Sequence, residues 1–211
     1  MVVLSTGWSV AAVADFTGDG KADIFWRRAD GANALWIMDG NKRVSAHFLP
    51  KVQPVWDLVG AGDFSGTGTS SLMWRNKVSG ANVMWAMYKG FRTKVTFANS
   101  APVRSLNWMV VGIADFTGDG HSDVMWRNKA DNRNMIWRFA SQSSFKAALL
   151  PKVAASWDVA ATADYDGDRS AEILWRNSNN GANVMWTTNG LVRTGVLFPP
   201  PVANTSYVVK E

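Results

Sequence analysis

The tryptophan residues of this chain recur at fixed intervals and divide its 211 residues into four repeated units. Each unit contains three of the 12 tryptophans, which are Trp8, Trp26, Trp36; Trp56, Trp74, Trp85; Trp108, Trp126, Trp137; and Trp157, Trp175, Trp186. An Asp stands seven positions after the first Trp of every unit, and the second Trp follows that Asp by eleven positions. Because the units begin 48, 52 and 49 residues apart and vary only in their connections, the chain is predicted to be a tandem repeat.

Each unit has the pattern of four short strands separated by turns rich in Gly, Asp and Asn. In the first unit these strands are predicted at residues 8–16, 22–28, 33–39 and 43–49. The second and third strands are apolar at consecutive positions, so we expect both of their faces to be covered. Repeated antiparallel units of this length predict an all-β fold, a β-propeller of four-stranded antiparallel blades with four blades per chain.

The repeat also predicts the domain organisation. We expect a single β-propeller domain over residues 1–211, a tail at 199–211, and blades at approximately 8–49, 56–98, 108–150 and 157–198. Tyr207 stands where the other units begin with Trp, so the tail is interpreted as part of a fifth repeat strand. An open stack would expose the Trp-bearing faces of its end blades. Either four blades close into a ring, or two chains form an eight-blade homodimer; a third interpretation is a cut or engineered repeat fragment.

Two acidic loops have the donor spacing of a hard-cation site. The sequences DFTGDGKAD (15–23) and DFTGDGHSD (115–123) place oxygen donors at positions one, three, five, seven and nine, with Gly at position six for a sharp turn. Oxygen-only donors without Cys or clustered His favour Ca²⁺ over zinc or copper. The predicted ligands, with the backbone carbonyl at position seven, are Asp15, Thr17, Asp19, Lys21 and Asp23, and Asp115, Thr117, Asp119, His121 and Asp123.

The other two loops depart from this pattern in opposite ways. The fourth, DYDGDRSAE, has the most acidic donor set but carries Arg169 at the Gly position, so either distortion or partial neutralisation is expected there. Its predicted ligands are Asp164, Asp166, Asp168, Ser170 and Glu172. The second loop, DFSGTGTSS, keeps only Asp63 among its charges and is expected to be metal-free. The alternative for all four loops is that they are only tight turns.

The segments VADFTGDGKADIFWRR and IADFTGDGHSDVMWRN resemble the FG-GAP/VCBS repeat family, the Ca²⁺-loop propellers of integrin α-subunit heads and many bacterial surface proteins. The resemblance covers nearly the whole chain and implies propeller architecture with Ca²⁺ at residues 15–23, 115–123 and 164–172. Family members usually close with about seven blades. They include fungal lectins that bind sugars between blades as well as adhesion and protein-binding propellers, so the resemblance constrains the fold more than the function.

An Arg directly follows the second Trp of every unit, and an Asn stands three positions before the third. Guanidinium and amide donors beside an aromatic face suit a sugar ring, and repeated weak sites gain strength by multivalency. A lectin-like carbohydrate-binding function is therefore the first hypothesis, with ligand residues Arg27, Asn33, Trp36, Arg75, Asn82, Trp85, Arg127, Asn134, Trp137, Arg176, Asn183 and Trp186. The alternative is that Arg and Asn satisfy backbone groups while Trp fills contacts between units.

Other functions are less well supported by the sequence. A protein-binding or adhesion scaffold would use the segments that differ between units, at 46–54, 96–106 and 149–156. With two His, no Cys and no nucleophile motif, we expect no enzymatic activity. The net charge of +5 favours anionic partners, but no run of Lys or Arg concentrates it, so nucleic acid is not the expected partner. No apolar stretch suits a membrane span, and we expect a secreted or cell-surface location although the N-terminus lacks a secretory signal.

Overall fold

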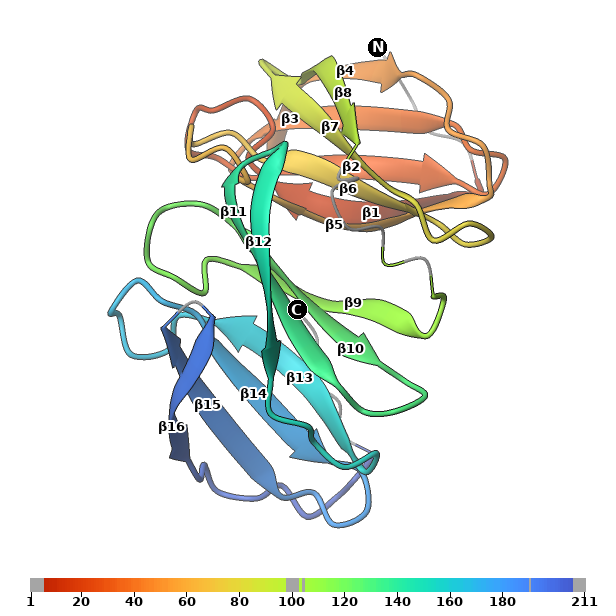
Figure 1. Cartoon of the computed structure of the whole chain (residues 1–211). Coiled ribbons are helices and arrows are strands. Elements are labelled where there is room, and N and C mark those ends of the chain that lie inside the picture. Colours follow the sequence, from red (N-terminus) through yellow and green to blue (C-terminus); the bar gives the residue numbers. More distant parts are fainter. Residues whose placement is uncertain (1–5, 98–102, 104, 190, 207–211) are drawn as a thin grey trace. The chain divides into compact units, whose positions relative to one another are not determined.

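The computed structural model describes residues 6–97, 103, 105–189 and 191–206. Within these residues, sixteen strands pair into four antiparallel sheets of four strands each (Figure 1). In every sheet the strands are hydrogen-bonded in the order in which they occur along the chain. The described residues include no helix of the length and apolar character that a membrane span needs. The prediction of an all-β fold of four-stranded antiparallel blades is therefore confirmed.

The strand bounds follow the tryptophan repeat. Blade 1 consists of β1 (Trp8–Ala14), β2 (Asp23–Arg28), β3 (Asn33–Asp39) and β4 (Lys42–Leu49). Blade 2 consists of β5 (Trp56–Gly62), β6 (Ser71–Asn76), β7 (Asn82–Tyr88) and β8 (Phe91–Phe97). Blade 3 consists of β9 (Trp108–Ala114), β10 (Asp123–Asn128), β11 (Asn134–Ser141) and β12 (Ser144–Leu150). Blade 4 consists of β13 (Trp157–Ala163), β14 (Glu172–Asn177), β15 (Asn183–Asn189) and β16 (Val192–Leu197).

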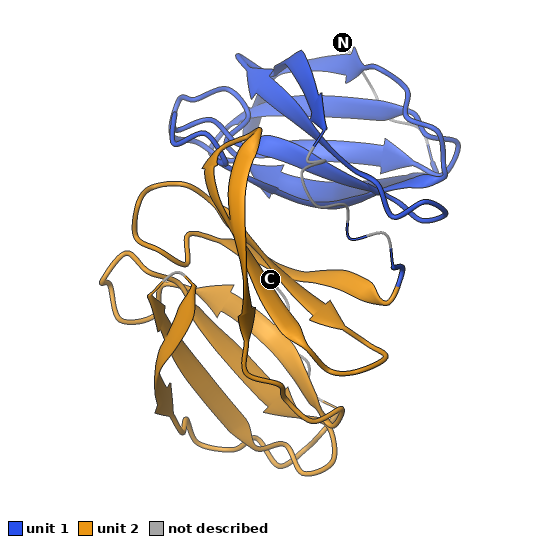
Figure 2. Cartoon of the chain, viewed as in Figure 1, with its two compact units in different colours: residues 1–106 blue, residues 107–211 orange. Residues whose placement is uncertain are grey.

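The chain divides into two compact units, residues 1–106 and 107–211, and each contains two blades (Figure 2). In the first unit, blades 1 and 2 pack through unlike faces. Blade 1 contributes a face that contains Phe16, Phe25 and Leu35, and we call this face and its equivalents the trailing face. Blade 2 contributes a face that contains Trp74 and Trp85, which we call the leading face. The rings of Phe25 and Trp74 meet edge to face, with centroids 6.1 Å apart.

The second unit repeats this arrangement. Phe116, Met125 and Ile136 of the blade 3 trailing face pack against Trp175 and Trp186 of the blade 4 leading face. All three trailing-face side chains are fully buried. One blade-to-blade contact, formed by a fixed set of repeat positions, therefore accounts for the core of both units.

Backbone hydrogen bonds join the blades at the same positions. The Ser70 N–H donates to the Asp15 carbonyl at 2.7 Å in the first unit, and the Ala171 N–H donates to the Asp115 carbonyl at 2.7 Å in the second. Both bonds connect the loop after the first strand of one blade with the equivalent loop of the next. The predicted metal loops are thus held at the junctions between blades.

The tail prediction is only partly covered by the structure. Residues 199–206 contain no strand, and Tyr207, with the rest of 207–211, lies outside the described residues. The expected fifth-repeat strand stays a prediction.

Candidate functional site

The first predicted metal loop joins β1 to β2 and is organised by the carboxylate of Asp15. Its Oδ1 atom accepts hydrogen bonds from the N–H groups of Thr17 (3.0 Å) and Gly18 (2.7 Å), and its Oδ2 atom accepts one from Gly20 (2.7 Å). Burial would raise the pKa of Asp15, but these backbone donors together lower it. The Gly20 φ of 81° supplies the sharp turn expected at position six.

The last position of the first and third loops holds a buried carboxylate, that of Asp23 and Asp123. The two oxygens of Asp123 accept hydrogen bonds from the N–H groups of Phe116 (3.1 Å) and Phe139 (2.9 Å). The pKa of Asp123 is raised to about 7, mainly by burial and in smaller part by the neighbouring carboxylates of Asp119 and Asp115, although the two backbone donors lower it. A buried carboxylate beside other carboxylates is the arrangement that a bound cation stabilises, so this donor set fits Ca²⁺.

The third loop repeats the backbone geometry of the first. Asp115 accepts the Gly118 and Gly120 N–H groups, each at 2.7 Å. One difference is Arg138, whose guanidinium lies 2.9 Å from Oδ2 of Asp119. Arg138 therefore competes with a cation for one of the predicted ligands.

The fourth loop brings three carboxylates together. Oxygens of Asp164, Asp166 and Glu172 lie within 4.8 Å of one another, and this is the one such acidic group among the described residues. Arg169 has a φ of 78°, close to that of the Gly it replaces, and its N–H donates to Asp164 at 3.0 Å. The loop therefore keeps the turn, and Arg169 contributes left-handed backbone strain where distortion was one expectation.

The second loop shows that the turn forms without the full acidic set. Asp63 accepts the N–H groups of Ser65 (3.2 Å) and Gly68 (2.6 Å), as the first Asp does in the other loops. The Ser65 and Thr67 hydroxyls lie 2.9 Å apart, where the other loops have metal-ligand candidates. Loop shape alone therefore does not indicate a metal, and the argument for Ca²⁺ rests on the donors.

The recurring Arg and Asn residues bind each other and the segment that leaves their own blade. Nη1 of Arg75 donates to the Asn82 side chain at 3.1 Å, and Nη2 donates to the carbonyls of Val103 (2.9 Å) and Ser105 (3.2 Å). We call this arrangement the clasp and the segment after each fourth strand the exit segment. The equivalent arginines Arg27, Arg127 and Arg176 make the same kinds of contact in the other blades.

The clasp supports the alternative in which the recurring Arg and Asn residues satisfy backbone groups and do not bind a ligand. In three blades the Asn amide also donates to a Pro carbonyl of the exit segment at 2.7–2.8 Å, through the pairs Asn33–Pro50, Asn134–Pro151 and Asn183–Pro200. The Arg donors are engaged inside the chain in every blade, and the Asn amide donors are engaged in these three. A ligand that used them would have to displace backbone contacts.

The third Trp of each blade, also a predicted ligand residue, has one ring face covered from the neighbouring outer strand. Arg43, Arg92 and Arg193 place their guanidinium carbons 4.6, 4.7 and 4.9 Å from the ring centroids of Trp36, Trp85 and Trp186 respectively. In blade 3, Phe145 stacks on Trp137 with centroids 4.3 Å apart. Each of these rings also contacts the second Trp of its blade, with centroids 4.7–5.1 Å apart. Trp85, Trp137 and Trp186 are at most 5% exposed, and Trp36 is half-buried.

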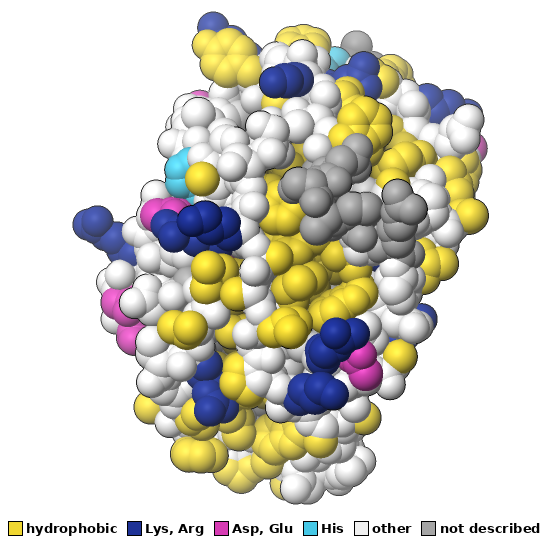
Figure 3. Space-filling model, in the orientation of Figure 1, with side chains coloured by type: hydrophobic (Ala, Val, Ile, Leu, Met, Phe, Trp, Pro, Cys, Tyr) yellow, Lys and Arg dark blue, Asp and Glu magenta, His cyan; other side chains and the backbone are white. Residues whose placement is uncertain are grey.

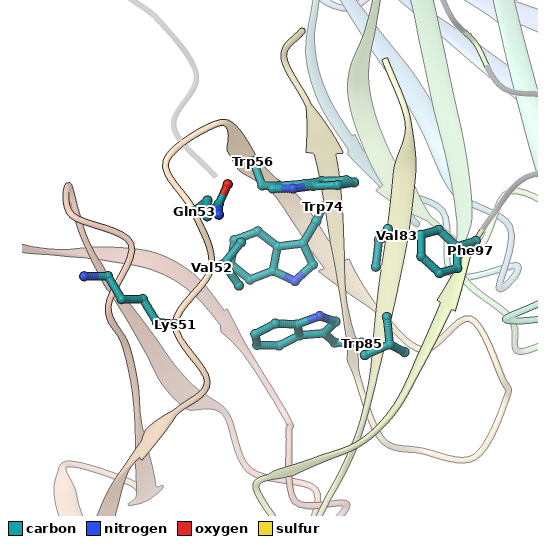
Figure 4. Close-up of a pocket in the computed structure, with 9 residues that line it drawn as sticks. Lys51, Val52, Gln53, Trp56, Trp74, Val83, Trp85 and Phe97 are labelled. Carbon is teal, nitrogen blue, oxygen red and sulfur yellow. The ribbon is translucent and has the colours of Figure 1, made fainter. Parts of the chain in front are cut away.

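A pocket of about 280 Å³ lies in the first unit, where the connection between β4 and β5 passes over blade 2 (Figure 4). Three indole rings, one each from β5, β6 and β7, form its aromatic wall (Figure 4). The lining residues are Lys51, Val52, Gln53, Trp56, Trp74, Val83, Trp85, Val95 and Phe97. The wall is mostly apolar, and Gln53 adds a polar group. The ammonium of Lys51 points away from the indole rings (Figure 4) and lies 3.3 Å from Oδ2 of Asp30.

Of the twelve predicted ligand residues, this pocket includes only Trp85. The sequence did indicate one part of it, because Lys51, Val52 and Gln53 belong to a segment that differs between the units. Trp56 and Trp74 recur in every unit, and neither is among the predicted ligand residues. Their additional position in a pocket wall depends on the path of the exit segment, which the repeat pattern does not encode.

Four-stranded antiparallel blades, joined by Asp-Gly loops at one kind of blade-to-blade contact, define a β-propeller-type repeat protein. The match to the FG-GAP-like repeat covers residues 15–74 and 115–175, more than half of the chain. The chain belongs to the FG-GAP-like repeat family. Family and fold together support a propeller binding module.

Solved structures agree on the fold. The chain is similar to part of the Photorhabdus luminescens Tc holotoxin pore, with a TM-score of 0.59 and 16% identity over 89% of this chain and 9% of that one. It is also similar to the Myceliophteria thermophila Cps50 (Swd1) β-propeller domain, with a TM-score of 0.51 and 10% identity over 85% of this chain and 56% of that one. The chain thus spans less than two thirds of either relative. No curated protein matches its sequence.

The basic charge is dispersed on the face drawn in Figure 3. Lys and Arg side chains lie there singly or in small groups between hydrophobic and neutral side chains (Figure 3). Several cations are paired with carboxylates, as in Lys21–Asp39 (3.0 Å) and Arg28–Asp30 (2.7 Å). On this face the net charge of +5 does not gather into a basic surface.

Proposed function

We propose that the protein is a calcium-stabilised propeller binding module that holds one ring of a carbohydrate in the aromatic pocket of the first unit. The observation that carries the proposal is a pocket in which the partly exposed ring of Trp56 and the exposed side chains of Val95 and Phe97 lie beside Gln53. Trp74 and Trp85 form the buried floor of this pocket, at 1% and 4% exposure. A pyranose ring has apolar C–H faces that stack on aromatic rings, and hydroxyls that need hydrogen-bonding partners at the edge of the site. The pocket offers both kinds of surface.

The size of the pocket limits the ligand. Small-molecule sites typically measure about 300–1,000 Å³, so a cavity of about 280 Å³ suits a single sugar ring at the end or side of a longer glycan. Affinity at one such site would be low, and strong binding would depend on several sites acting together. A protein-binding scaffold is the competing function.

Carbohydrate binding is tested with the whole chain on a glycan array, followed by calorimetry with the best saccharide. Gln53→Ala is expected to weaken binding about 2- to 10-fold, the effect of one lost hydrogen bond of about 0.5–1.5 kcal/mol. Lys51→Ala is expected to act in the same direction. The matched control is Lys152→Ala, which removes the Lys at the equivalent position of blade 3. If no saccharide on a broad array bound the protein, the result would contradict the carbohydrate proposal and favour a protein-binding scaffold.

We assign one Ca²⁺ site to each of three loops, the first, the third and the fourth. The ligands would be Asp15, Thr17, Asp19, Lys21 and Asp23; Asp115, Thr117, Asp119, His121 and Asp123; and Asp164, Asp166, Asp168, Ser170 and Glu172. The support is the oxygen-only donor set, the raised pKa of the buried Asp123 carboxyl, and the three converging carboxylates of the fourth loop. When bound, Ca²⁺ would neutralise these carboxylates and fix the loops where blades meet.

Calcium titration is expected to give three bound ions per chain. Asp119→Thr should remove one ion, because Thr is the residue that the second loop has at this position. Asp63→Asn in the second loop is the control and should leave the count unchanged. Free Ca²⁺ at 100 times its dissociation constant should stabilise the fold by about 2.7 kcal/mol per site, so EGTA should lower the melting temperature. If neither Ca²⁺ nor EGTA changed the melting temperature, the result would contradict the proposal.

A further inference from the structure

The net positive charge of the chain lies in the unit that contains the aromatic pocket. Residues 1–106 contain 12 Lys and Arg side chains and 7 Asp, whereas residues 107–211 contain 10 Lys and Arg and 10 Asp and Glu. Residues 64–114 contain six Lys and Arg and no acidic side chain. This stretch includes β6, β7 and β8, which contribute five of the nine residues that line the pocket. The pocket is therefore built largely from a basic part of the chain.

Arg92, on the outer strand β8, places its charge beside this pocket. Its guanidinium carbon lies 4.7 Å from the ring centroid of Trp85, and Val95 of the same strand is paired with Trp85 in the β7–β8 register. Trp85 and Val95 both line the pocket. Arg92 is exposed, and among the described residues of the first unit no carboxylate forms an ion pair with it. Within that unit, its charge is not neutralised.

A second guanidinium, that of Arg27, lies against two other residues of the pocket. Nη2 of Arg27 donates to the carbonyl of Trp56 at 2.8 Å, and its guanidinium carbon lies 4.8 Å from the ring centroid of Trp74. Burial lowers the pKa of Arg27, although the carboxylates of Asp57 and Asp30 raise it. Because the clasp already engages this guanidinium, Arg27 adds positive potential to the pocket without needing to contact a ligand.

The two carboxylates that act on Arg27 are already paired with other cations. Asp30 lies 2.7 Å from Arg28 and 3.3 Å from Lys51, and Asp57 lies 3.4 Å from Lys77. These pairs account for two carboxylates and three cations, so they add no negative charge to offset the two arginines beside the pocket. The surroundings of the pocket are positive, and this favours a ligand that carries a negative charge.

We propose that the sugar ring held in this pocket is an acidic one, a hexuronate whose carboxylate binds the guanidinium of Arg92. The proposal rests on the proposed carbohydrate function and narrows it to one class of sugar. A uronate carries its carboxylate directly on the ring, so a single ring supplies both an apolar face for Trp56 and an anion for the edge of the pocket. The planar donor fork of Arg matches a carboxylate in a bidentate arrangement.

The test compares the affinity of the whole chain for acidic and neutral sugars, by calorimetry at constant Ca²⁺. The probes are short oligosaccharides of galacturonate, glucuronate, mannuronate and guluronate, each measured beside the neutral oligosaccharide made by reducing its carboxyl groups to alcohols. At least one acid is expected to bind about 5- to 10-fold more tightly than its neutral counterpart. This preference should be largely lost in about 1 M NaCl, where the screening length falls to about 3 Å.

Variants of β8 identify the group that reads the carboxylate. Arg92→Gln should reduce the preference for the acid to about twofold or less, and Arg92→Lys should keep only part of it, because an ammonium lacks the planar fork. The matched control is Lys94→Gln, which removes one exposed cation from the same strand. Lys94 does not line the pocket, and the alternation of side chains along a strand places it on the face opposite to Val95. The control should leave the preference unchanged.

Two results would overturn the assignment of an acidic sugar and leave carbohydrate binding intact. One is that no acid binds more tightly than its neutral counterpart. The other is that Lys94→Gln lowers the preference as much as Arg92→Gln, because the effect would then come from general charge and not from contact with Arg92. Binding of no saccharide at all, acidic or neutral, would instead contradict the proposed function, and this assignment with it. Failure of the narrower proposal is thus distinguishable from failure of the proposed function.

Discussion

Replacing Phe116 with Ala is expected to lower the free energy of unfolding by about 3–5 kcal/mol. Phe116 is fully buried in the contact between blades 3 and 4, within a cluster that includes Trp175 and Trp186. Loss of the ring removes apolar contacts and leaves a cavity, and the rigid strands around it can collapse only partly. Urea denaturation followed by tryptophan fluorescence, at constant Ca²⁺ and at concentrations below any self-association, measures the change.

The repeat supplies the control for this experiment. Tyr165 occupies the position of Phe116 in blade 4 but is 48% exposed, so Tyr165→Ala should cost far less, about 1 kcal/mol or below. The difference between these variants measures how much a neighbouring blade contributes at one repeat position. Equal losses would contradict the assignment of Phe116 to the contact between blades.

Replacing Arg75 with Ala is expected to cost about 3 kcal/mol or more, because it leaves several buried acceptors without a donor. Arg75 is 7% exposed, and its guanidinium donates to the side chain of Asn82 and to the carbonyls of Gly80, Val103 and Ser105. Burial lowers the pKa of Arg75, since a charge removed from solvent is less favourable. Thermal and urea unfolding both measure the loss.

Two further variants separate the clasp from a simple change of charge. Arg75→Lys keeps the charge but presents a point ammonium in place of a planar fork, so most of the loss should persist. Lys94→Ala removes a charge from the exposed strand β8 and should change stability little. If the Arg75→Lys variant were as stable as the wild type, stability would not depend on the planar geometry of the guanidinium, and our interpretation of the clasp would be wrong.

The sequence predicted the blades well because their strands depend on local, repeated features. Tryptophan spacing and Gly-rich turns set four strands per unit, and the structure differs by only one or two residues at their ends. The first strand ends at Ala14 and not at residue 16, because Asp15 already accepts the backbone bonds of the loop. Such boundaries depend on side-chain acceptors, which the apolar pattern does not register.

The candidate site was less predictable from the sequence, because its residues are distant along the chain and the path of the backbone brings them together. The recurrence of Arg75 and Asn82 was visible, but the carbonyls that they hold have no residue signature. Gln53 and Trp85 are distant in sequence and meet only because the exit segment crosses the next leading face. The turn at Arg169 forms despite the unfavourable residue type, since the surrounding loop bonds outweigh the local preference.

The clasp ties each exit segment to the blade that precedes it, which has a consequence for the ancestry of such chains. A DNA segment that starts at the first Trp codon of a blade and ends beyond its exit segment encodes every donor and acceptor of one clasp. Unequal crossing-over at those points would add or remove whole blades without breaking a clasp. A breakpoint between Arg27 and Val52 that joined a non-equivalent position of another blade would instead leave a donor without its acceptors. Blade number can therefore change in whole steps between related genes.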